Sequence, residues 1–204
     1  MRVYDMEQRS PEWHAIRKGV ITGTRVKEVF ASNNLKLVDK LIGEKYSDAD
    51  EDMISSAAIQ RGIDLEPHAR REYERYTGLE VDDLGFVLHA DRDWHGHSPD
   101  GMVKVNSKHV IGIEIKCPNT STHVRYIRMN KLPAEYRHQV YNMFLVNPDI
   151  ERVDFISYDN RFTIKPIHII PIHRADVQVE LDEIDAGLVA FMDKMNKYEQ
   201  LVTF

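Results

Sequence analysis

Several features are scarce in this sequence of 204 residues. Its single cysteine, Cys117, excludes a disulfide framework, a four-cysteine zinc site and an iron–sulfur cluster. No stretch approaches the roughly 18 consecutive apolar residues of a membrane-spanning helix. The first residues also lack the apolar core of a signal peptide. We therefore expect a cytoplasmic protein that does not enter a membrane.

Positive charge is also in short supply, because the formal net charge is −6. Overall charge therefore does not indicate a nucleic-acid-binding protein, and any contact with phosphates must come from a local concentration of Arg and Lys. The best candidate is the span 123–139, which contains several basic residues and only one acid, Glu135. There is no internal repeat or low-complexity linker, so we predict one α/β domain over residues 1–204.

Capping signals and hydrophobic periodicity predict the order of helices and strands. A helix begins at Ser10-Pro11 and ends near Gly19, and a second runs from Thr22 to about Ala31. A long helix over 55–78 should be kinked or restarted at Pro67. The other expected helices are 37–45, 120–129, 134–146 and one from about 175, and the expected strands are 85–90, 102–105, 110–116, 152–158 and 164–172.

Two of these segments allow more than one interpretation. The last helix carries apolar residues at 177, 181, 184, 188, 191, 195 and 198. We expect this stripe to cover the core, although a subunit or partner interface is an alternative. The acidic run 47–52 is predicted to be a solvated loop that faces away from phosphates or borders the entrance to a site.

The most informative stretch joins Ser98-Pro99-Asp100-Gly101 to Glu114-Ile115-Lys116. Asp100-Gly101 is a turn pair, and with apolar runs on both sides it predicts a hairpin turn there. In the second segment isoleucines alternate with Glu114 and Lys116, so the two charged residues share one face of a strand. Taken alone, such a pattern is usually a turn followed by a solvated strand face.

The functional interpretation of this stretch is a metal-dependent nuclease. Two carboxylates can hold a hard divalent cation such as Mg²⁺, and a lysine beside them can orient or deprotonate an attacking water. The spacing matches the PD-(D/E)xK nuclease signature, with Asp100 and Glu114 separated by residues 101–113.

Three other groups of residues attract attention. Glu66, just before Pro67, is either one of several exposed acids or a third carboxylate near the sheet. Arg17 and Thr24 flank a turn that ends at a helix N-terminus, which suits an anion, although a surface charge and a helix-start hydroxyl are the alternative. His89, His95 and His97 suggest zinc, but they lack a second ligand pair at zinc spacing and a cysteine partner, so we expect them to titrate without a role or to form hydrogen bonds.

Five motifs, taken in order, resemble the lambda-exonuclease (YqaJ-like recombinase) family. They cover about residues 13–145, and the C-terminal third matches only in its pattern of two strands and a helix. The matching segments are Trp13 to Thr22, Glu66 with Ala69-Arg70, Ser98 to Gly101, Glu114 to Pro118 with Thr120-Ser121, and Tyr136 with Gln139-Val140.

The resemblance implies a fold and a role for each matching residue. The fold would be a PD-(D/E)xK restriction-endonuclease-like core, with a central mixed β-sheet flanked by helices. Asp100, Glu114 and the backbone carbonyl of Ile115 would bind Mg²⁺, for which Mn²⁺ could substitute, and Glu66 would complete the acidic cluster. Lys116 would position the attacking water. The expected contacts to the 5′-phosphate and the DNA come from Arg17, Thr24, Ser98, Tyr136 and Gln139.

The resemblance also implies an activity and partners. The family degrades one strand of linear double-stranded DNA from the 5′ end, releasing mononucleotides and leaving a 3′ single-stranded overhang. Its members form homotrimers and work with a single-strand annealing protein. Two alternatives remain: an endonuclease of restriction or repair type that bears the same motif, and a non-catalytic module that binds DNA ends on the same fold. The strand-separating wedge residue of the family has no motif counterpart in residues 31–55.

Overall fold

The computed structural model describes residues 1–47 and 56–203. The predicted acidic run therefore lies outside the described residues except for Ser47. The strands are β1 (Arg2–Tyr4), β2 (Phe86–Leu88), β3 (Gly96–His97), β4 (Gly101–Val105), β5 (Lys108–Lys116), β6 (Arg152–Tyr158) and β7 (Ile167–His173). The helices are α1 (Pro11–Ile16), α2 (Gly23–Val29), α3 (Leu35–Tyr46), α4 (Ala57–Thr77), α5 (Thr120–Met129), α6 (Arg137–Val146) and α7 (Gln178–Val202), with short 3₁₀ turns at Ala134–Tyr136 and Arg174–Asp176.

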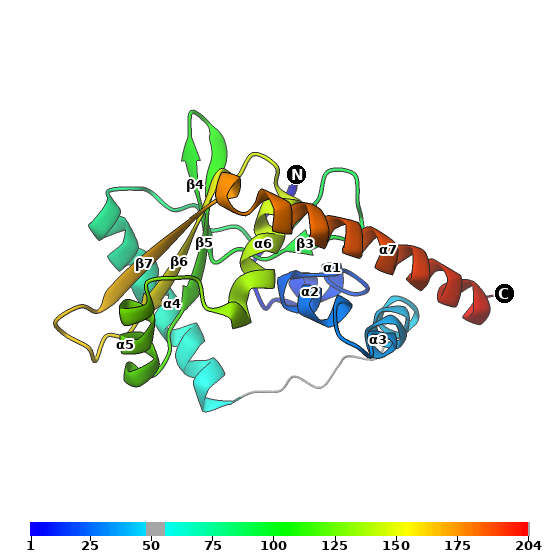
Figure 1. Cartoon of the computed structure of the whole chain (residues 1–204), viewed down its shortest axis with the longest axis horizontal. Coiled ribbons are helices and arrows are strands. Elements are labelled where there is room, and N and C mark those ends of the chain that lie inside the picture. Colours follow the sequence, from blue (N-terminus) through cyan, green and yellow to red (C-terminus); the bar gives the residue numbers. More distant parts are fainter. Residues whose placement is uncertain (48–55, 204) are drawn as a thin grey trace.

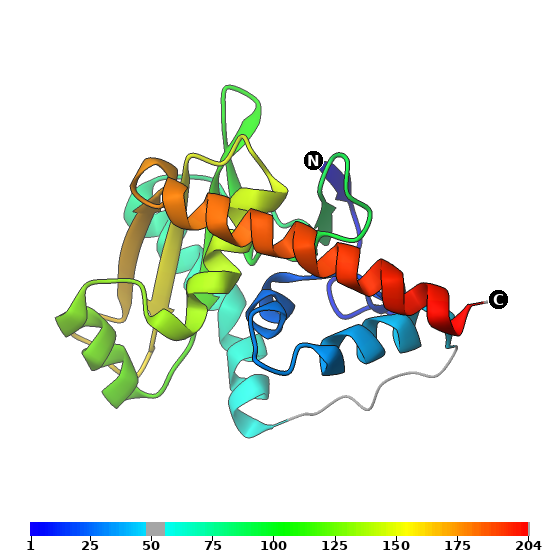
Figure 2. The same ribbon diagram turned by 45° about the vertical axis from the view of Figure 1, so that its right-hand side comes forward.

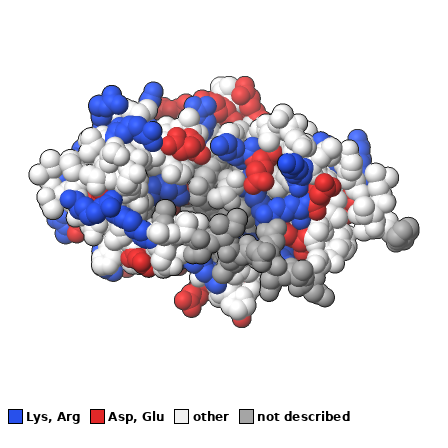
Figure 3. Space-filling model, turned by 90° about the horizontal axis from the view of Figure 1, so that it is seen from below, with Lys and Arg blue, Asp and Glu red and all other residues white. Residues whose placement is uncertain are grey.

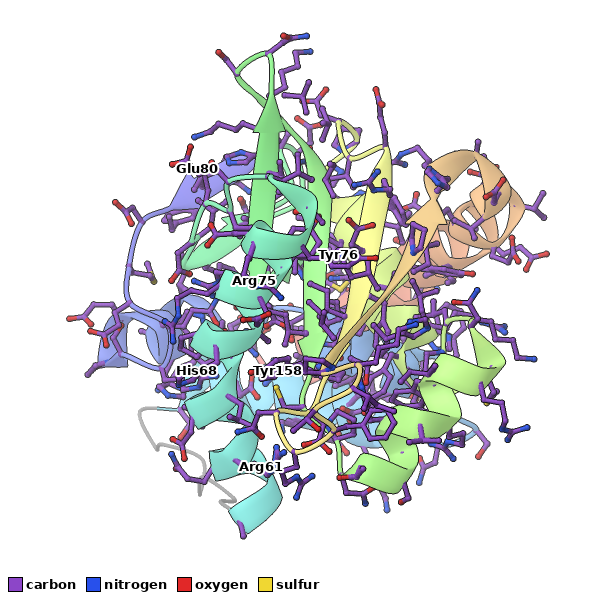
Figure 4. The ribbon with its side chains drawn as sticks, turned by 90° about the vertical axis from the view of Figure 1, so that its left-hand side faces the viewer. Arg61, His68, Arg75, Tyr76, Glu80 and Tyr158 are labelled. Carbon is purple, nitrogen blue, oxygen red and sulfur yellow. The ribbon has the colours of Figure 1, made fainter. Side chains whose placement is uncertain are left out.

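A four-stranded sheet of order β4-β5-β6-β7 forms the centre of the molecule. The β5–β6 pair is parallel and the other two pairs are antiparallel, so the sheet is mixed. Parallel neighbours need a long connection, and here it is made by α5 and α6. Helix α4 lies across the opposite face of the sheet from α5 and α6 (Figures 1 and 4). The predicted α/β fold, a mixed sheet flanked by helices, is confirmed.

The alternation of β5 decides which side chains each layer receives. Ile111, Ile113 and Ile115 are buried in one cluster with Ala69 and Tyr73 of α4. Glu114 and Lys116 project from the other face, because side chains of a strand alternate. The register sets Glu114 beside Phe155 of β6, which packs against Tyr136 just before α6.

Gly112 allows α6 to lie close to that second face. A Cβ atom at this position would come within 1.9 Å of the sulfur of Met143 in α6. Any side chain here would therefore displace the side chain of Met143, which packs over the strand that carries Glu114. The glycine thus leaves room for close contact between α6 and β5.

A smaller sheet of order β1-β2-β3 connects the N-terminal helices to the centre. Ile21 pairs with His95 by a parallel bridge, so the turn between α1 and α2 is attached to the segment that leads into β3. Helix α7 runs along α6, α2 and α3 (Figures 1 and 2). Within the described residues, no helix has an apolar stretch long enough to cross a membrane.

The predicted core-covering stripe of the last helix is confirmed for most of its residues. Positions 177, 181, 184, 188, 191 and 195 are buried, whereas Tyr198 is 38% exposed. The helix itself begins at Gln178, after the 3₁₀ turn, and not at 175.

One local prediction is wrong, and one of the two alternatives at Pro67 is excluded. The chain does not reverse at Asp100-Gly101, because Gly101 already pairs with Ile113 as the first residue of β4. The reversal is at Asn106 and Ser107, whose φ angles of 50° and 66° are those of a tight hairpin turn. The long helix also does not restart at Pro67, since α4 continues through it.

Candidate active site

The end of β5 places a buried acid beside a lysine. The side chain of Glu114 is completely buried, and the ammonium nitrogen of Lys116 lies 2.5 Å from its Oε1. Apart from this ion pair, the carboxylate has no partner among the described residues. A buried carboxylate with so few donors is costly. Its second oxygen is therefore open to a further cation or donor.

The electrostatics of this pair show how far it is removed from water. Burial raises the pKa of Glu114 to about 7, against the opposing charge of Lys116 and with the help of Asp100 and Glu66. Burial also acts to lower the pKa of Lys116, but the charges of Glu114 and Asp100 outweigh it and raise that pKa. The lysine is consequently held as an ammonium ion while it faces Glu114.

Asp100 stands at the entrance to β4, next to the same strand. Its Oδ2 accepts a hydrogen bond of 2.7 Å from the backbone N–H of Ile115. Burial raises its pKa, and the charge of Lys116 lowers it in part. The loop that carries Asp100 is secured by Gln8, whose amide donates to the carbonyl oxygen of Pro99 at 2.8 Å.

Glu66 reaches the group from α4. Burial raises its pKa, and the negative charge of Asp100 raises it further, so the two carboxylates are electrostatic neighbours. Two arginines neutralise it: Arg9 at 3.3 Å and Arg70 at 3.4 Å. We call Glu66, Asp100, Glu114 and Lys116 the carboxylate cluster.

The donors of this cluster suit a hard divalent cation. Asp100, Glu114 and Glu66 supply carboxylate oxygens and Ile115 a backbone carbonyl, which are the ligand types of Mg²⁺. In their present positions, however, no three His, Cys, Asp or Glu side chains of the described residues are arranged to hold a metal ion. The carboxylate of Glu114 is paired with Lys116, and that of Glu66 is paired with Arg9 and Arg70. The open oxygen of buried Glu114 is the feature that fits a cation.

A second group of polar side chains surrounds Arg17, between α1 and β3. The guanidinium lies 3.8 Å from the ring centroid of Trp13 and donates a 2.7 Å hydrogen bond to Oγ of Ser98. The indole N–H of Trp13 donates to the same oxygen at 3.0 Å. Because Ser98 accepts both bonds, its own hydroxyl hydrogen remains available to an acceptor.

Positive charge accumulates around Arg17. Burial lowers its pKa to about 10, and the charge of Arg25 lowers it further, while Glu44 opposes this effect. Arg25 is itself paired with Glu44 and also donates to the carbonyl of Val20 at 2.8 Å. This pair therefore braces the turn after Arg17. A buried guanidinium with a second cation nearby favours binding of an anion.

The other predicted DNA-binding residues separate in space. Gln139 lies at the start of α2, since a Cβ on Gly23 would be 3.1 Å from its Cγ. Tyr136 lies with the carboxylate cluster, because Nζ of Lys116 is 5.1 Å from its ring centroid. Thr24 is exposed, whereas Thr22, which precedes Gly23, is 2% exposed and its hydroxyl has no partner among the described residues.

Several residues at the site were missed by the sequence-based predictions. Arg9, which contacts Glu66, has no sequence signal that marks it, and His97, which lies beside Gly23, was considered only as a zinc ligand. Thr22 could have been found, because it stands at the start of the helix that was predicted to bind an anion. Trp13 precedes Arg17 by one helical turn, which is the spacing of side chains that touch on a helix. We call Trp13, Arg17, Thr22, His97 and Ser98 the Arg17 cluster.

The surface seen from below carries Lys and Arg side chains in patches, with Asp and Glu among them (Figure 3). In the predicted basic span, Arg125 is paired with the single acid, Glu135, at 3.5 Å. A cavity of about 390 Å³ lies at the C-terminal end of α4, where Arg75, Tyr76 and residues 164–169 line it (Figure 4). None of the candidate site residues lines this cavity.

Comparison with known proteins adds an independent observation to this geometry. Residues 12–147 match the YqaJ-like viral recombinase domain. The chain belongs to this family. Both clusters fall within the matched residues, and the matched span ends directly after α6. No match was found among the curated proteins.

Solved structures share the fold of this YqaJ-family chain. It is similar to an alkaline exonuclease (LHK-Exo) from Laribacter hongkongensis, with 33% sequence identity, a TM-score of 0.83 and coverage of 95% of this chain and 96% of the other. LHK-Exo in complex with dAMP gives 34% identity and a TM-score of 0.82 over the same shares. A phage related exonuclease from Haemophilus somnus 129PT shares the fold at 16% identity, with a TM-score of 0.54 and coverage of 98% and 96%.

Proposed function

We propose that this YqaJ-family protein is a Mg²⁺-dependent exonuclease that degrades linear double-stranded DNA in the 5′-to-3′ direction. It would release 5′-mononucleotides and leave a 3′ single-stranded overhang for annealing. The observation that carries the proposal is the buried Glu114 carboxylate, with an open oxygen, beside Lys116 and Asp100. The similarity to LHK-Exo, which was also solved with dAMP, supports an exonuclease and a mononucleotide product.

The chemistry follows from the charges. Hydrolysis of a phosphodiester requires neutralisation of the phosphate oxygens while a water attacks in line. A divalent cation held by Asp100, Glu114 and the Ile115 carbonyl would supply that charge and lower the pKa of a bound water. Lys116 would then leave Glu114 and be free to orient the water or to stabilise the developing negative charge. Glu66 would complete the acidic group after release from Arg9 and Arg70.

The Arg17 cluster gives the proposal its direction. A terminal 5′-phosphate is a dianion, and a guanidinium with neutral hydroxyl and amide donors recognises such a group well. Arg17 and Ser98 are already joined, and Thr22 and Gln139 lie at the adjacent start of α2. We assign the 5′ end of the degraded strand to this cluster.

The decisive experiment compares three DNA substrates in Mg²⁺ and in EDTA. The substrates are linear duplex with 5′-phosphates, the same duplex closed covalently at both ends, and single-stranded DNA. We expect mononucleotides from the open duplex in Mg²⁺ alone, and 3′-tailed intermediates on gels. Cleavage of the closed duplex would indicate an endonuclease instead. Tight binding to ends without hydrolysis would indicate an end-binding module.

We also propose, from the resemblance, a homotrimer that acts with a single-strand annealing protein. Light scattering of the purified protein measures its mass in solution and so tests the trimer. A measured mass of 23.8 kDa, that of a single chain, would contradict it. The rate of annealing of resected ends, with and without an annealing protein, tests the partner.

A further inference from the structure

His97 is the most unusual polar side chain near the two clusters. It ends β3, which is held by β2 on one side and by Ile21 on the other through the N–H of Gly96. The side chain is buried, with 3% exposure. Neither of its ring nitrogens has a hydrogen-bond partner among the described residues.

Other buried histidines of the chain differ in this respect. His95, two residues earlier, has Nε2 2.6 Å from Oδ1 of Asn142. His123 uses both nitrogens, Nδ1 at 2.7 Å from Oγ of Ser157 and Nε2 at 2.9 Å from the carbonyl of Lys165. Buried polar groups without partners carry a desolvation cost, and in folded proteins they are uncommon. At His97 both ring nitrogens contribute to this desolvation cost.

The neighbours of His97 indicate which kind of ligand could form hydrogen bonds with its ring nitrogens. Its Nδ1 would be 3.2 Å from a Cβ on Gly23, so the ring lies against the first residue of α2, where Gln139 also lies. Arg17 and Lys116 are both near enough that their charges lower its pKa, to about 3, after burial as the main cause. The ring is therefore neutral at physiological pH, with one N–H donor and one acceptor.

A neutral donor suits this position better than another cation. Arg17, Arg25 and Lys116 already supply positive charge, so a charged imidazolium would be repelled. An N–H dipole adds a hydrogen bond to an anion without that repulsion. The unpartnered hydroxyl of Thr22 is close in sequence, next to Gly23, and is also buried. Two buried side chains at the start of α2, both without a hydrogen-bond partner among the described residues, thus indicate a polar ligand.

We propose that the ring N–H of His97 donates a hydrogen bond to the 5′-terminal phosphate of the DNA, as a specificity residue beside Arg17 and Ser98. The inference rests on the proposed function, because it assumes that the Arg17 cluster receives that phosphate. It adds a residue on β3 whose ring lies against Gly23 and senses the charges of both Arg17 and Lys116.

The test measures discrimination between two DNA ends, with three variants of His97. His97→Phe keeps a ring of similar shape and removes both nitrogens, His97→Ala removes them without added bulk, and His97→Gln retains a donor. The ligands are short duplexes that carry either a 5′-phosphate or a 5′-hydroxyl. Their affinities are measured by fluorescence anisotropy in EDTA, so that no hydrolysis is needed, and kcat/KM is measured separately in Mg²⁺.

We expect His97→Phe and His97→Ala to reduce the preference for phosphate by roughly 10- to 150-fold, the range for a hydrogen bond to a charged group. Affinity for the hydroxyl end should stay close to that of the wild type, and His97→Gln should retain most of the preference. His168→Ala is the matched control. His168 is also buried with an unpartnered Nε2, but it is on β7, and its removal should leave the preference unchanged.

An unchanged phosphate preference in folded His97→Ala protein would overturn the inference, and so would equal losses on both ends. Unchanged affinity for both ends would make His97 a packing residue, and equal losses would make it a general DNA-binding residue. Failure of the proposed function gives a different result. If the wild type discriminates between the ends in EDTA but does not hydrolyse DNA in Mg²⁺, the nuclease proposal fails and the role of His97 still stands or falls by the binding data.

Discussion

The two clusters of the site differ in the kind of polar group that each contains in excess. In the carboxylate cluster three acids are brought together, and Lys116, Arg9 and Arg70 neutralise them. In the Arg17 cluster the excess is of donors, because the hydroxyl of Thr22 and the ring of His97 have no partners among the described residues. We propose that the first region receives a cation and the second an anion. Mutations should therefore separate the two functions.

Loss of the cation-binding side should have the largest effect. Asp100→Asn and Glu114→Gln remove negative charge with little change in volume, and we expect kcat to fall at least about 10³-fold, since a metal contributes several kcal/mol to the transition state. EDTA should abolish cleavage, and Ca²⁺ should permit DNA binding with little turnover. The measurement is the rate of mononucleotide release. Full activity of the wild type in EDTA would refute the mechanism.

Lys116 comes next, because it belongs to the catalytic side but is not a proposed metal ligand. Lys116→Ala should lower kcat by about 10²- to 10³-fold, the usual loss for one group that stabilises the transition state. The Kd for DNA should change little, which anisotropy can show. Normal turnover at saturating DNA, with collapsed binding, would instead make Lys116 an anchor for phosphate.

Arg17 tests the anion-binding side. Arg17→Ala should slow digestion of 5′-phosphorylated duplex by roughly 10- to 150-fold, the effect of losing a charge-assisted hydrogen bond. Digestion of duplex with 5′-hydroxyl ends should be almost unchanged, since that substrate never makes the contact. Initial rates of both enzymes on both ends provide the double comparison. If both ends slow by the same factor, Arg17 is a general DNA-binding residue.

The pH dependence of the free energy of unfolding should reveal the buried Glu114 of the metal-free carboxylate cluster. Burial raises the pKa of Glu114 to about 7, so the folded protein retains a proton there that the unfolded chain releases near its ordinary value of 4.5. The free energy of unfolding in EDTA should therefore fall as the pH rises from about 5 to 8, because the folded state binds more protons in this range. Glu114→Gln should flatten this slope in urea titrations. An identical slope in both proteins would contradict the shift.

The same pKa bears on the metal. Protonated Glu114 cannot bind a cation, so apparent Mg²⁺ affinity should weaken as the pH falls below about 7. Activity titrated with Mg²⁺ at several pH values measures this effect, and Glu114→Asp offers a variant that retains a carboxylate. Affinity that is independent of pH between 5 and 8 would remove Glu114 from the proposed ligands.

The smallest effect concerns two neighbouring threonines and Gln139. Thr22 is buried and its hydroxyl has no hydrogen-bond partner in the part of the chain that the structure describes, whereas Thr24 is exposed. Thr22→Val should therefore reduce the preference for a 5′-phosphate by about 2- to 10-fold, as expected for one neutral hydrogen bond, and Thr24→Val should reduce it less. Gln139→Ala should resemble Thr22→Val. A larger loss from Thr24→Val would return that residue to the phosphate site, as the family resemblance implies.

Local patterns were enough to predict much of the fold. The alternation of β5 placed Glu114 and Lys116 on one face, and the structure keeps them there, because side chains of a strand repeat every two residues whatever surrounds them. Helix starts at Ser10 and Ser56 follow from side-chain caps that bond to the third residue beyond. Turn chemistry was less decisive. Asp100-Gly101 has the stronger hairpin signal, but the pairing of Gly101 with Ile113 forces the reversal at Asn106 and Ser107.

Composition, periodicity and motif spacing thus determined by themselves the α/β fold class and the face of β5 that carries Glu114 and Lys116. Tertiary structure decided which donors surround them. Arg9 meets Glu66 across 57 positions and Arg17 meets Ser98 across 81. His97 was placed against Gly23 at the start of α2, on a two-residue strand paired to β2. Such contacts depend on packing between distant segments, and no local periodicity encodes them, so the charge balance of each cluster exists only in the folded chain.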